Sequence, residues 1–321
     1  MKEQTNEIDN FFESSRVDLE KKILSTISDE KIISILQGGK RLRPFLAHLA
    51  FKTCTKGNES SIEYQRALEG AVGIELAHSA SLVHDDIIDK DKERRGKTTF
   101  HVKEGVASAL LTGHKMLAVG FNIALSHGKE VARLYIESWD EVVNGEIKEI
   151  DFNHKDNKSS KGSYTKSQIF EAYNRIINMK TASLFSSACK AGAIEANMSG
   201  DILKVFADYG REIGLAYQLA DDLVDLIKGE LIDSVLLPLF TRLGNKMNEE
   251  DSTKLGPVRK RLRKHSSKIK QIYVEEIKRH VDKAEELSNS KLIPSSPYKD
   301  LLKEAPAYII NQMLKEIKIA I

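Results

Sequence analysis

Cysteine and proline are both scarce in this chain, which contains two cysteines and six prolines among 321 residues. The two thiols, Cys54 and Cys189, cannot build a disulfide framework or a cysteine-rich zinc site, so we expect small core residues in a reducing compartment. Few prolines leave long stretches free to continue as helices. These absences argue against a small disulfide-stapled fold and favour long helices.

An excess of charge of one sign is also lacking, since 49 Lys and Arg residues face 47 Asp and Glu residues. A balanced chain has no global field that would attract a polyanion, so we expect no nucleic-acid partner. The basic run from Arg259 to Lys270 is expected to belong to a charged surface helix, and contact with a membrane or a nucleic acid is its alternative.

Long apolar runs are missing as well. The sequence has no stretch of about 18 apolar residues that could span a bilayer. The stretch from Met1 to Arg16 is polar and lacks the apolar segment of a secretory signal. We therefore expect a cytoplasmic protein that is not transmembrane.

Apolar residues recur mostly at spacings of three and four, as between Glu63 and Asp86, and few segments alternate as strands do. Candidate breaks between helices fall at Gln37 to Pro44, Thr55 to Ser61, Lys92 to Thr99, Asn153 to Ser163, Gly256 to Pro257 and Ile293 to Pro297. None of them is long enough to separate two domains. The pattern predicts an all-α, single-domain bundle over residues 1–321, with about ten helices.

One short motif occurs twice, as DDIID at Asp85 to Asp89 and as DDLVD at Asp221 to Asp225. On a helix the first and fifth residues of this motif share one face, about 6 Å apart along the axis, where like charges repel. A divalent cation relieves that repulsion, and carboxylates suit Mg²⁺ that bridges to a phosphate-bearing substrate. The repeated motif predicts Mg²⁺ binding; a solvated helix end is the alternative for either copy alone.

Basic residues accompany the aspartates in two places. Arg94 and Arg95 follow the first motif, and Lys40, Arg41 and Arg43 follow two glycines in GGKRLRP. Guanidinium forks and ammonium groups bind phosphate oxygens, and glycines let the backbone approach an anion. The residues predict a site for two diphosphates bridged by metal ions, although GGKRLRP alone is also compatible with an ordinary loop.

Lys180 lies in an otherwise apolar helical run, next to Thr181. A lysine in such a run needs an anionic partner, unless its ammonium group reaches solvent at the edge of the core. Together with Gln218, which shortly precedes the second motif, these residues form a third candidate group.

Four segments, GGKRLRP, HSASLVHDDIIDKDKERRG, KTASLF and YQLADDLVD, occur in this order between about residues 35 and 240. In composition and order they resemble the trans-isoprenyl diphosphate synthases of the polyprenyl synthetase family, and most of all geranylgeranyl diphosphate synthases. The resemblance implies long helices around a deep central cavity, usually in a homodimer. It also implies a Mg²⁺-dependent prenyltransferase that condenses isopentenyl diphosphate with an allylic diphosphate to give a trans-prenyl diphosphate.

The resemblance further implies a role for each matching residue. The metal ligands would be Asp85, Asp89 and Asp221, supported by Asp86, Asp222 and Asp225. The allylic diphosphate or its leaving group would contact Arg94, Lys180 and Gln218. The diphosphate of isopentenyl diphosphate would contact Lys40, Arg43, His78 and Arg95. Thr181 would lie beside the developing carbocation.

Three small residues, Ala77, Ala80 and Ser81, precede the first motif. In the family, bulky side chains at such positions close the cavity and limit the product to short chains. Small residues here predict a product of geranylgeranyl length (C20) or longer, with a cavity floor elsewhere, such as at Met116, Leu117 or Phe121. Close helix packing is the alternative explanation for the small residues.

The chain departs from the family in two places. The stretch after Asp225 is shortened, so that Lys228 or Asp233 would have to replace residues of a longer loop, and Gly113 and His114 stand where relatives often have Gly-Asp. Four alternatives remain open: a longer-chain synthase, a non-catalytic subunit of a heteromeric synthase, a terpene cyclase, and a phosphohydrolase using the residues around His78 and His84.

Overall fold

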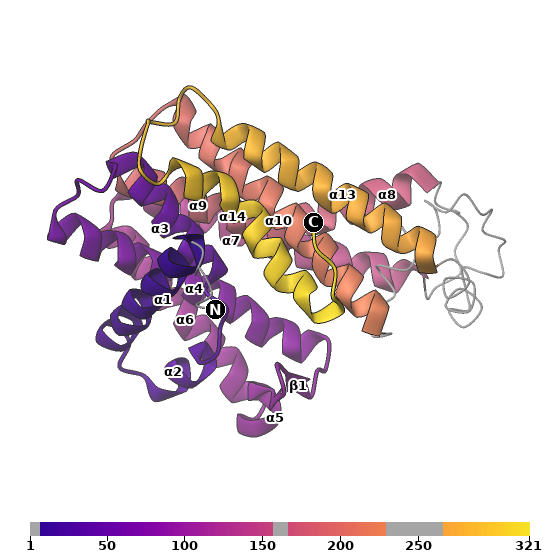
Figure 1. Ribbon diagram of the computed structural model, residues 1–321. Coiled ribbons are helices and arrows are strands. Elements are labelled where there is room, and N and C mark those ends of the chain that lie inside the picture. The colour runs from indigo at the N-terminus through magenta and orange to yellow at the C-terminus, as the bar shows by residue number, and fades with distance from the viewer. Residues whose placement is uncertain (1–6, 157–165, 229–265) are drawn as a thin grey trace, which may run out of the picture.

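The computed structural model describes residues 7–156, 166–228 and 266–321, and most of them are helical (Figure 1). The predicted all-α class is confirmed, since the strands among these residues are the two-residue β1 (Glu93–Arg94) and β2 (Lys97–Thr98). Asp233 and the part of the basic run from Arg259 to His265 lie outside the described residues. No helix within the described ranges is long and apolar enough to cross a membrane.

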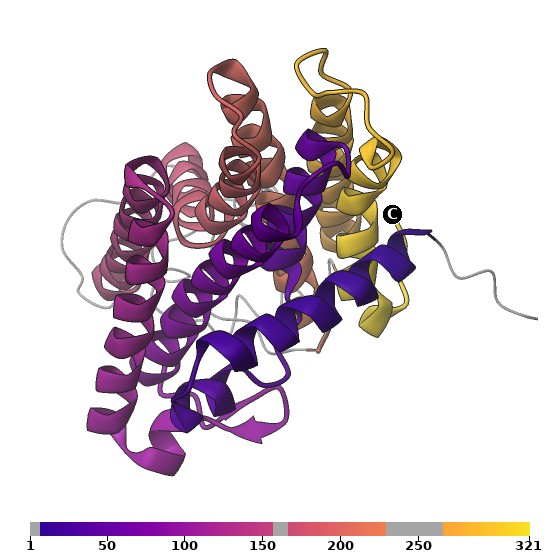
Figure 2. The same ribbon diagram turned by 90° about the vertical axis from the view of Figure 1, so that its left-hand side faces the viewer.

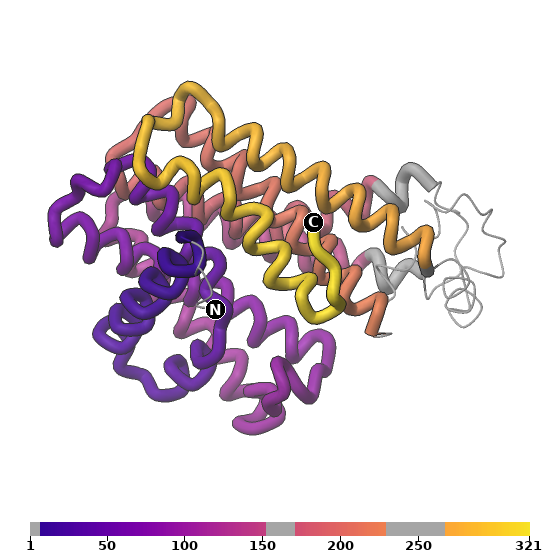
Figure 3. The backbone as a smooth tube through the Cα atoms, in the orientation of Figure 1, coloured from indigo at the N-terminus to yellow at the C-terminus, as the bar shows by residue number. Residues whose placement is uncertain are grey.

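The chain path in Figure 3 passes first through an N-terminal group of helices. This group consists of α1 (Glu7–Thr26), α2 (Glu30–Leu36), α3 (Leu42–Thr55), α4 (Ser61–Ile88), α5 (Phe100–Glu104), α6 (Val106–Ser126) and α7 (Lys129–Asp156). The second group consists of α8 (Lys166–Ile177), the π-helical turn η1 (Asn178–Ala182), α9 (Ser183–Glu195), α10 (Asp201–Lys228), α13 (Ser266–Ser288), α14 (Lys299–Leu314) and the 3₁₀ turn η2 (Lys315–Ile317).

Local sequence explains where the helices begin and end. Ser60 and Glu63 form a reciprocal cap at the start of α4, in which the Glu63 backbone N–H donates to Ser60 Oγ and the Ser60 backbone N–H donates to the Glu63 carboxylate. This cap places the break between Thr55 and Ser61 as predicted. α7, by contrast, continues beyond Asn153 to Asp156. Polar residues without glycine or proline do not by themselves end a helix.

Two hydrophobic cores hold the bundle together. The first joins α3, α9, α10, α13 and α14, and it contains the buried, unpaired Cys54 and Cys189, which confirms their prediction as core residues. The second joins α1, α2, α4, α6 and α7. Figure 2 shows α1 lying across α3 and α4, so the N-terminal helix closes one side of the bundle.

The helix that carries the second aspartate motif packs backbone to backbone against its neighbour. A Cβ atom at Gly210 of α10 would lie 2.3 Å from the carbonyl oxygen of Phe185, and one at Gly214 would lie 2.6 Å from Cα of Ala182. No side chain fits at these distances, so glycine is required at both positions. This contact fixes α10 against the turn that contains Lys180 and Thr181.

Candidate active site

A cavity of about 800 Å³ lies between α4, α7, α8, η1, α10 and the loop before α3. Segments that are far apart in the sequence meet in it, and most of the predicted site residues line it. They are Lys40, Arg43, His78, Ser81, Asp85, Asp89, Arg94, Arg95, Lys180, Thr181, Gln218, Asp221, Asp222 and Asp225.

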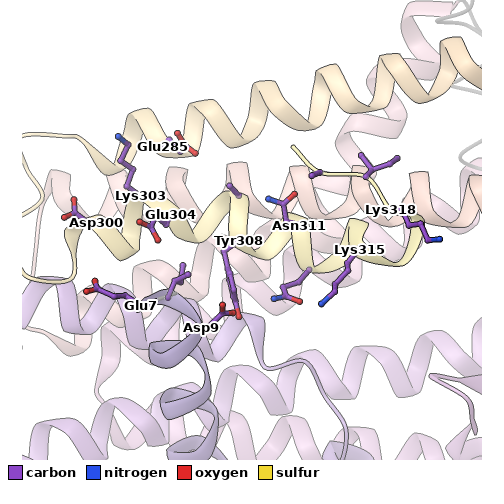
Figure 4. Close-up of a pocket in the computed structure, with 15 residues that line it drawn as sticks. Glu7, Asp9, Glu285, Asp300, Lys303, Glu304, Tyr308, Asn311, Lys315 and Lys318 are labelled. Carbon is purple, nitrogen blue, oxygen red and sulfur yellow. The ribbon is translucent and has the colours of Figure 1, made fainter. Parts of the chain in front are cut away.

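A second hollow, of about 1000 Å³, lies between α1, α14 and the C-terminal residues (Figure 4). It contains none of the predicted site residues. Tyr308 reaches toward Asp9 there, and the labelled acidic side chains lie around Lys303, with Lys315 and Lys318 on the other side. The chemistry predicted from the sequence therefore belongs to the first cavity.

The first aspartate motif occupies the C-terminal end of α4. Asp85 and Asp89 are one helical turn apart, with the Asp89 backbone N–H donating to the Asp85 carbonyl at 2.8 Å. The pKa of Asp85 is raised to about 7, mainly by burial, with the charge of Lys180 opposing the shift and the charges of Glu146 and Asp89 adding to it. Burial likewise raises the pKa of Asp89. Both carboxylates would gain from a nearby cation.

Lys180 is surrounded by carboxylates. Its Nζ atom lies 2.6 Å from Glu146 Oε2 and 2.7 Å from Glu149 Oε2. Burial alone would lower its pKa, but Asp85, Glu149 and Glu146 outweigh burial and raise it. The anionic partner expected for this lysine thus exists within the protein.

Sequence reasoning missed Glu146 and Glu149, although a signal was present. Both lie on α7 at helical spacing from the buried Val142, so they follow an inward-facing stripe instead of a solvated face. A Cβ atom at Gly145 would lie 2.8 Å from the backbone nitrogen of Lys180. The glycine lets α7 approach η1 closely enough for both glutamates to reach the lysine.

Lys180 and Thr181 lie in the π-helical turn η1, between α8 and α9. Such a turn inserts extra backbone into a helix and is frequent at functional sites. Thr181 Oγ1 donates to Gln218 Oε1 at 2.7 Å, which connects η1 to α10.

The second aspartate motif is held from α8 as well as from its own helix. Asp222 accepts hydrogen bonds from the Tyr173 hydroxyl and from Gln218 Nε2, the latter at 3.0 Å. Burial raises the pKa of Asp222 to about 7 despite both donors, and it raises the pKa of Asp221 against the opposing charges of Lys40 and Arg94. Tyr173 is a further residue that the sequence did not reveal, because no local pattern links it to Asp222.

The first turn of α3 supplies a buried cation. Arg43 Nη1 lies 2.9 Å from His78 Nε2, and the guanidinium carbon lies 4.3 Å from the centre of the Phe185 ring. Burial lowers the pKa of Arg43 to about 10, which leaves it charged at neutral pH. Burial, followed by the charge of Arg43, lowers the pKa of His78 well below its ordinary value, so the neutral imidazole can accept from the guanidinium. Arg43 Nε has no hydrogen-bond partner among the described residues.

The other basic residues divide between the cavity and its surroundings. Arg94 Nε donates to Asp86 Oδ1 at 2.5 Å, and Arg95 Nη1 lies 3.4 Å from the Gly38 carbonyl oxygen. Lys40 Nζ lies 3.7 Å from Met313 Sδ. Arg41, by contrast, does not line the cavity; it pairs with the buried Glu75 and with the partly exposed Glu20.

The three small residues before the first motif do not share one environment. Ser81 lines the cavity, whereas Ala80 is fully buried in the second core, together with Met116 and Leu117. Ala77 is partly buried and packs on the same core. Of the three small residues, only Ser81 therefore lines the cavity, and Ala77 and Ala80 serve helix packing.

The two departures from the expected pattern have local explanations. Gly113 lies against the ring of His84, where a Cβ atom would be 2.4 Å from Nε2, and His114 is exposed with its ring 5.3 Å from that of His84. Lys228 pairs with Glu316 at 2.6 Å. Glu316 itself lines the cavity.

Residues 25–231 match the sequence model of a known family, Polyprenyl synthetase. A geranylgeranyl diphosphate synthase of Methanosarcina mazei is 32% identical over 200 residues, which cover 60% of this chain and 56% of that protein. Heptaprenyl diphosphate synthase component 2 of Geobacillus stearothermophilus is 30% identical over 71% of this chain and 70% of its own length. The match thus spans little more than half of the first of these relatives.

Solved structures share the fold. A geranylgeranyl pyrophosphate synthetase from Pyrococcus horikoshii superposes with a TM-score of 0.74 at 24% identity, over 94% of this chain and 97% of that one. A polyprenyl synthase from Caulobacter crescentus, complexed with calcium and isoprenyl diphosphate, has a TM-score of 0.75 at 23% identity, over 94% and 96% of the two chains. The helical architecture around the cavity is therefore one that occurs in known proteins.

Proposed function

The chain belongs to the polyprenyl synthetase family, and on that premise we propose that it is a prenyltransferase acting on two diphosphates. It would condense isopentenyl diphosphate with an allylic diphosphate to give a trans-prenyl diphosphate. One observation carries the proposal: two aspartate pairs and two separate groups of cations line the same cavity. A site for a single phosphate ester would not need both groups.

The carboxylates of this cavity fit Mg²⁺, which prefers hard oxygen ligands and retains several waters. Asp85, Asp89 and Asp221 would hold the ions, with Asp86, Asp222 and Asp225 in support. Among the described residues, no three acidic, histidine or cysteine side chains converge on one metal-sized point. Each ion would accordingly take further ligands from water and from a diphosphate. When bound, Mg²⁺ would neutralise charge on the diphosphate oxygens as a Lewis acid.

The basic residues define two subsites. Arg94, Lys180 and Gln218 would contact the allylic diphosphate, whose C–O bond breaks to give an allylic cation and free diphosphate. Arg94 and Lys180 stabilise the negative charge that develops on this leaving group. Lys40, Arg43, His78 and Arg95 would bind the diphosphate of isopentenyl diphosphate, and the unpartnered Nε of Arg43 offers a hydrogen bond there.

The remaining steps follow from the same arrangement. The double bond of isopentenyl diphosphate attacks the allylic cation, and loss of a proton to the released diphosphate gives an allylic product longer by five carbons. Thr181 would lie beside the cation, with the apolar side chains of Val142, Ile176 and Ile177 excluding water from it.

A C20 product, geranylgeranyl diphosphate, is the favoured outcome. The small Ser81 lines the cavity near the first motif, whereas Met116 and Leu117 belong to the second core and do not line the cavity. A longer product is the second candidate, because relatives with octaprenyl and heptaprenyl names are about as similar.

We further propose a single domain over residues 1–321 that works as a homodimer. α6 and α7 pack together and expose an apolar face consisting of Val106, Leu110, Leu111, Leu125, Ile136, Val143 and Ile147. Exposed apolar patches of this kind mark protein contacts. A second copy of the chain would cover the patch.

A non-catalytic subunit of a heteromeric synthase is the competing function, and the relative named as component 2 of a synthase is the observation that favours it. The complete set of acidic and basic groups in one cavity favours an active subunit instead.

The decisive experiment incubates the purified protein with Mg²⁺, labelled isopentenyl diphosphate and, separately, dimethylallyl, geranyl and farnesyl diphosphates. Products are dephosphorylated and separated by chain length. A dominant C20 product is expected. Absence of elongation with every primer would contradict the proposal, and restored elongation on addition of a second chain would identify the subunit role. Turnover without isopentenyl diphosphate would indicate a cyclase or a phosphohydrolase.

A further inference from the structure

The segment in which the loop with Lys40 enters α3 with Arg43 is anchored by a residue that faces away from the cavity. Arg41 adopts a left-handed backbone conformation with φ of 57°, and its side chain is 2% exposed. Its Nη1 atom lies 2.7 Å from Glu75 Oε1, its Nε atom 2.9 Å from Glu20 Oε1, and its Nη2 atom 2.5 Å from the Leu36 carbonyl oxygen. One guanidinium group therefore ties together α1, the end of α2 and α4.

The glycine before Lys40 belongs to the same arrangement. A Cβ atom at Gly39 would lie 2.2 Å from Arg41 Nη1 and 2.9 Å from Glu75 Oε1. The loop thus runs directly over the ion pair, with no room for a side chain between them. The loop therefore has two sides: Gly38 and Lys40 line the cavity, together with Arg43 from the first turn of α3, whereas Gly39 and Arg41 pack behind it.

Glu75 connects this anchor to the reactive side of the cavity. Its side chain is 4% exposed on α4, one turn before His78, which contacts Arg43 at 2.9 Å. α4 then continues to Asp85, the first aspartate of the DDIID motif. A buried pair of this kind contributes little net stability but is costly to break, because it leaves one charge buried alone. Its geometry is suited to fixing a position.

We propose that Arg41 and Glu75 are positioning residues that hold Lys40 and Arg43 in the geometry that binds the diphosphate of isopentenyl diphosphate. The proposal rests on the function proposed above. Arg41 does not touch substrate; it acts by fixing the backbone of the loop against α4. The allylic diphosphate, bound by Arg94 and Lys180, is outside its reach.

Two variants test this role. Arg41→Lys keeps the positive charge but replaces three separate guanidinium nitrogens by a single ammonium nitrogen, which cannot reach Glu20, Glu75 and the Leu36 carbonyl together. Glu75→Gln keeps the shape while removing the charge. Each should raise KM for isopentenyl diphosphate by about tenfold, the effect of one displaced charge-assisted contact, with KM for the allylic primer changed by less than about twofold. The matched control is Glu59→Gln, which breaks the buried pair of Lys52 and Glu59 at the other end of α3. The control variant should lower the unfolding temperature and leave both KM values unchanged.

Equal increases in both KM values, or a loss of kcat with an unchanged KM for isopentenyl diphosphate, would overturn the proposal. A second measurement tests the positioning role of Arg41 and Glu75 independently of the proposed enzymatic activity. Calorimetric titration with inorganic pyrophosphate and no metal should show weaker binding to Glu75→Gln than to Glu59→Gln, even if the wild-type protein fails to elongate any primer. Equal affinity would refute the anchor. If Glu75→Gln does not fold, Arg41→Lys decides by the same criteria.

Discussion

Lys180 Nζ lies 3.9 Å from Asp85 Oδ2, which joins the π-helical turn between α8 and α9 to the end of α4. The same ammonium group is closer still to Glu146 and Glu149. One lysine therefore balances three carboxylates beside the first aspartate motif. Any cation that binds there enters a field that is already partly neutralised.

The aspartates of both motifs should be essential for turnover. Asp85→Ala and Asp221→Ala each remove a carboxylate proposed to hold Mg²⁺, and we expect elongation to fall by at least about a thousandfold, the scale of a lost electrostatic stabiliser. Circular dichroism should show unchanged helicity. Near-normal turnover in either variant would remove the metal assignment.

Glu149 should tune the affinity for the metal. In Glu149→Gln, one negative charge is lost and the charge of Lys180 is less well balanced, so both effects weaken cation binding near Asp85. The Mg²⁺ concentration for half-maximal rate should rise several-fold, by about 3–10 times. Glu141→Gln is the control, because Glu141 lies on the same helix but pairs with Arg211 at 3.3 Å. An equal shift in both variants would show a nonspecific effect.

Two neighbouring substitutions should separate cavity shape from core packing. Ser81→Phe places a ring in the cavity and should shorten the product, as seen by chromatography of the dephosphorylated chains. Ala80→Phe was equally expected to shorten the product on sequence grounds, but Ala80 is 0% exposed in the core. It should instead destabilise the fold by about 1–3 kcal/mol through overpacking. An unchanged product in Ser81→Phe would place length control elsewhere.

His48 should make stability depend on pH. Burial lowers its pKa to about 4 from an ordinary 6.5, so the unfolded chain binds the proton more tightly. The contribution of the neutral His48 to the free energy of unfolding is fully present above pH 6.5 and is lost as pH falls toward 4. The loss amounts to about 2 kcal/mol at pH 5. Urea unfolding measures the free energy of unfolding at pH 7.5 and at pH 5. The decrease between the two pH values should be smaller in His48→Gln than in the wild type by this amount. The raised pKa values of Asp85 and Asp222 act in the opposite sense, so the comparison between wild type and variant is the informative one.

The apolar face of α6 and α7 should control association. Leu111 is 69% exposed there, and Leu111→Glu would place a charge in the proposed contact between two copies. Light scattering should show a dimer for the wild type and a monomer for the variant. Leu24→Glu is the control, because Leu24 is 63% exposed on a different helix, α1. A monomeric wild type would contradict the homodimer.

The sequence predicted the features that depend on local pattern. The helical periodicity, the break before Ser61 and the two aspartate motifs were all visible in short windows, and the structure places both motifs in one cavity. The sequence could not predict that Arg43 lines the cavity while Arg41 packs behind it. This difference depends on the left-handed backbone of Arg41 and on its partner Glu75 from another helix. Tyr173 and its hydrogen bond to Asp222 likewise arise from tertiary contact between α8 and α10.

The glycine contacts of α10 restrict how this protein could change during evolution. With Gly210 and Gly214 pressed against α9 and η1, these helices cannot move apart or closer without losing their packing. New volume for a larger product cannot come from that wall. It has to come from side chains of α4 and α7 that line the cavity, such as Ser81 and Val142. Selection for a different product length should therefore leave its substitutions on one half of the bundle and spare the other.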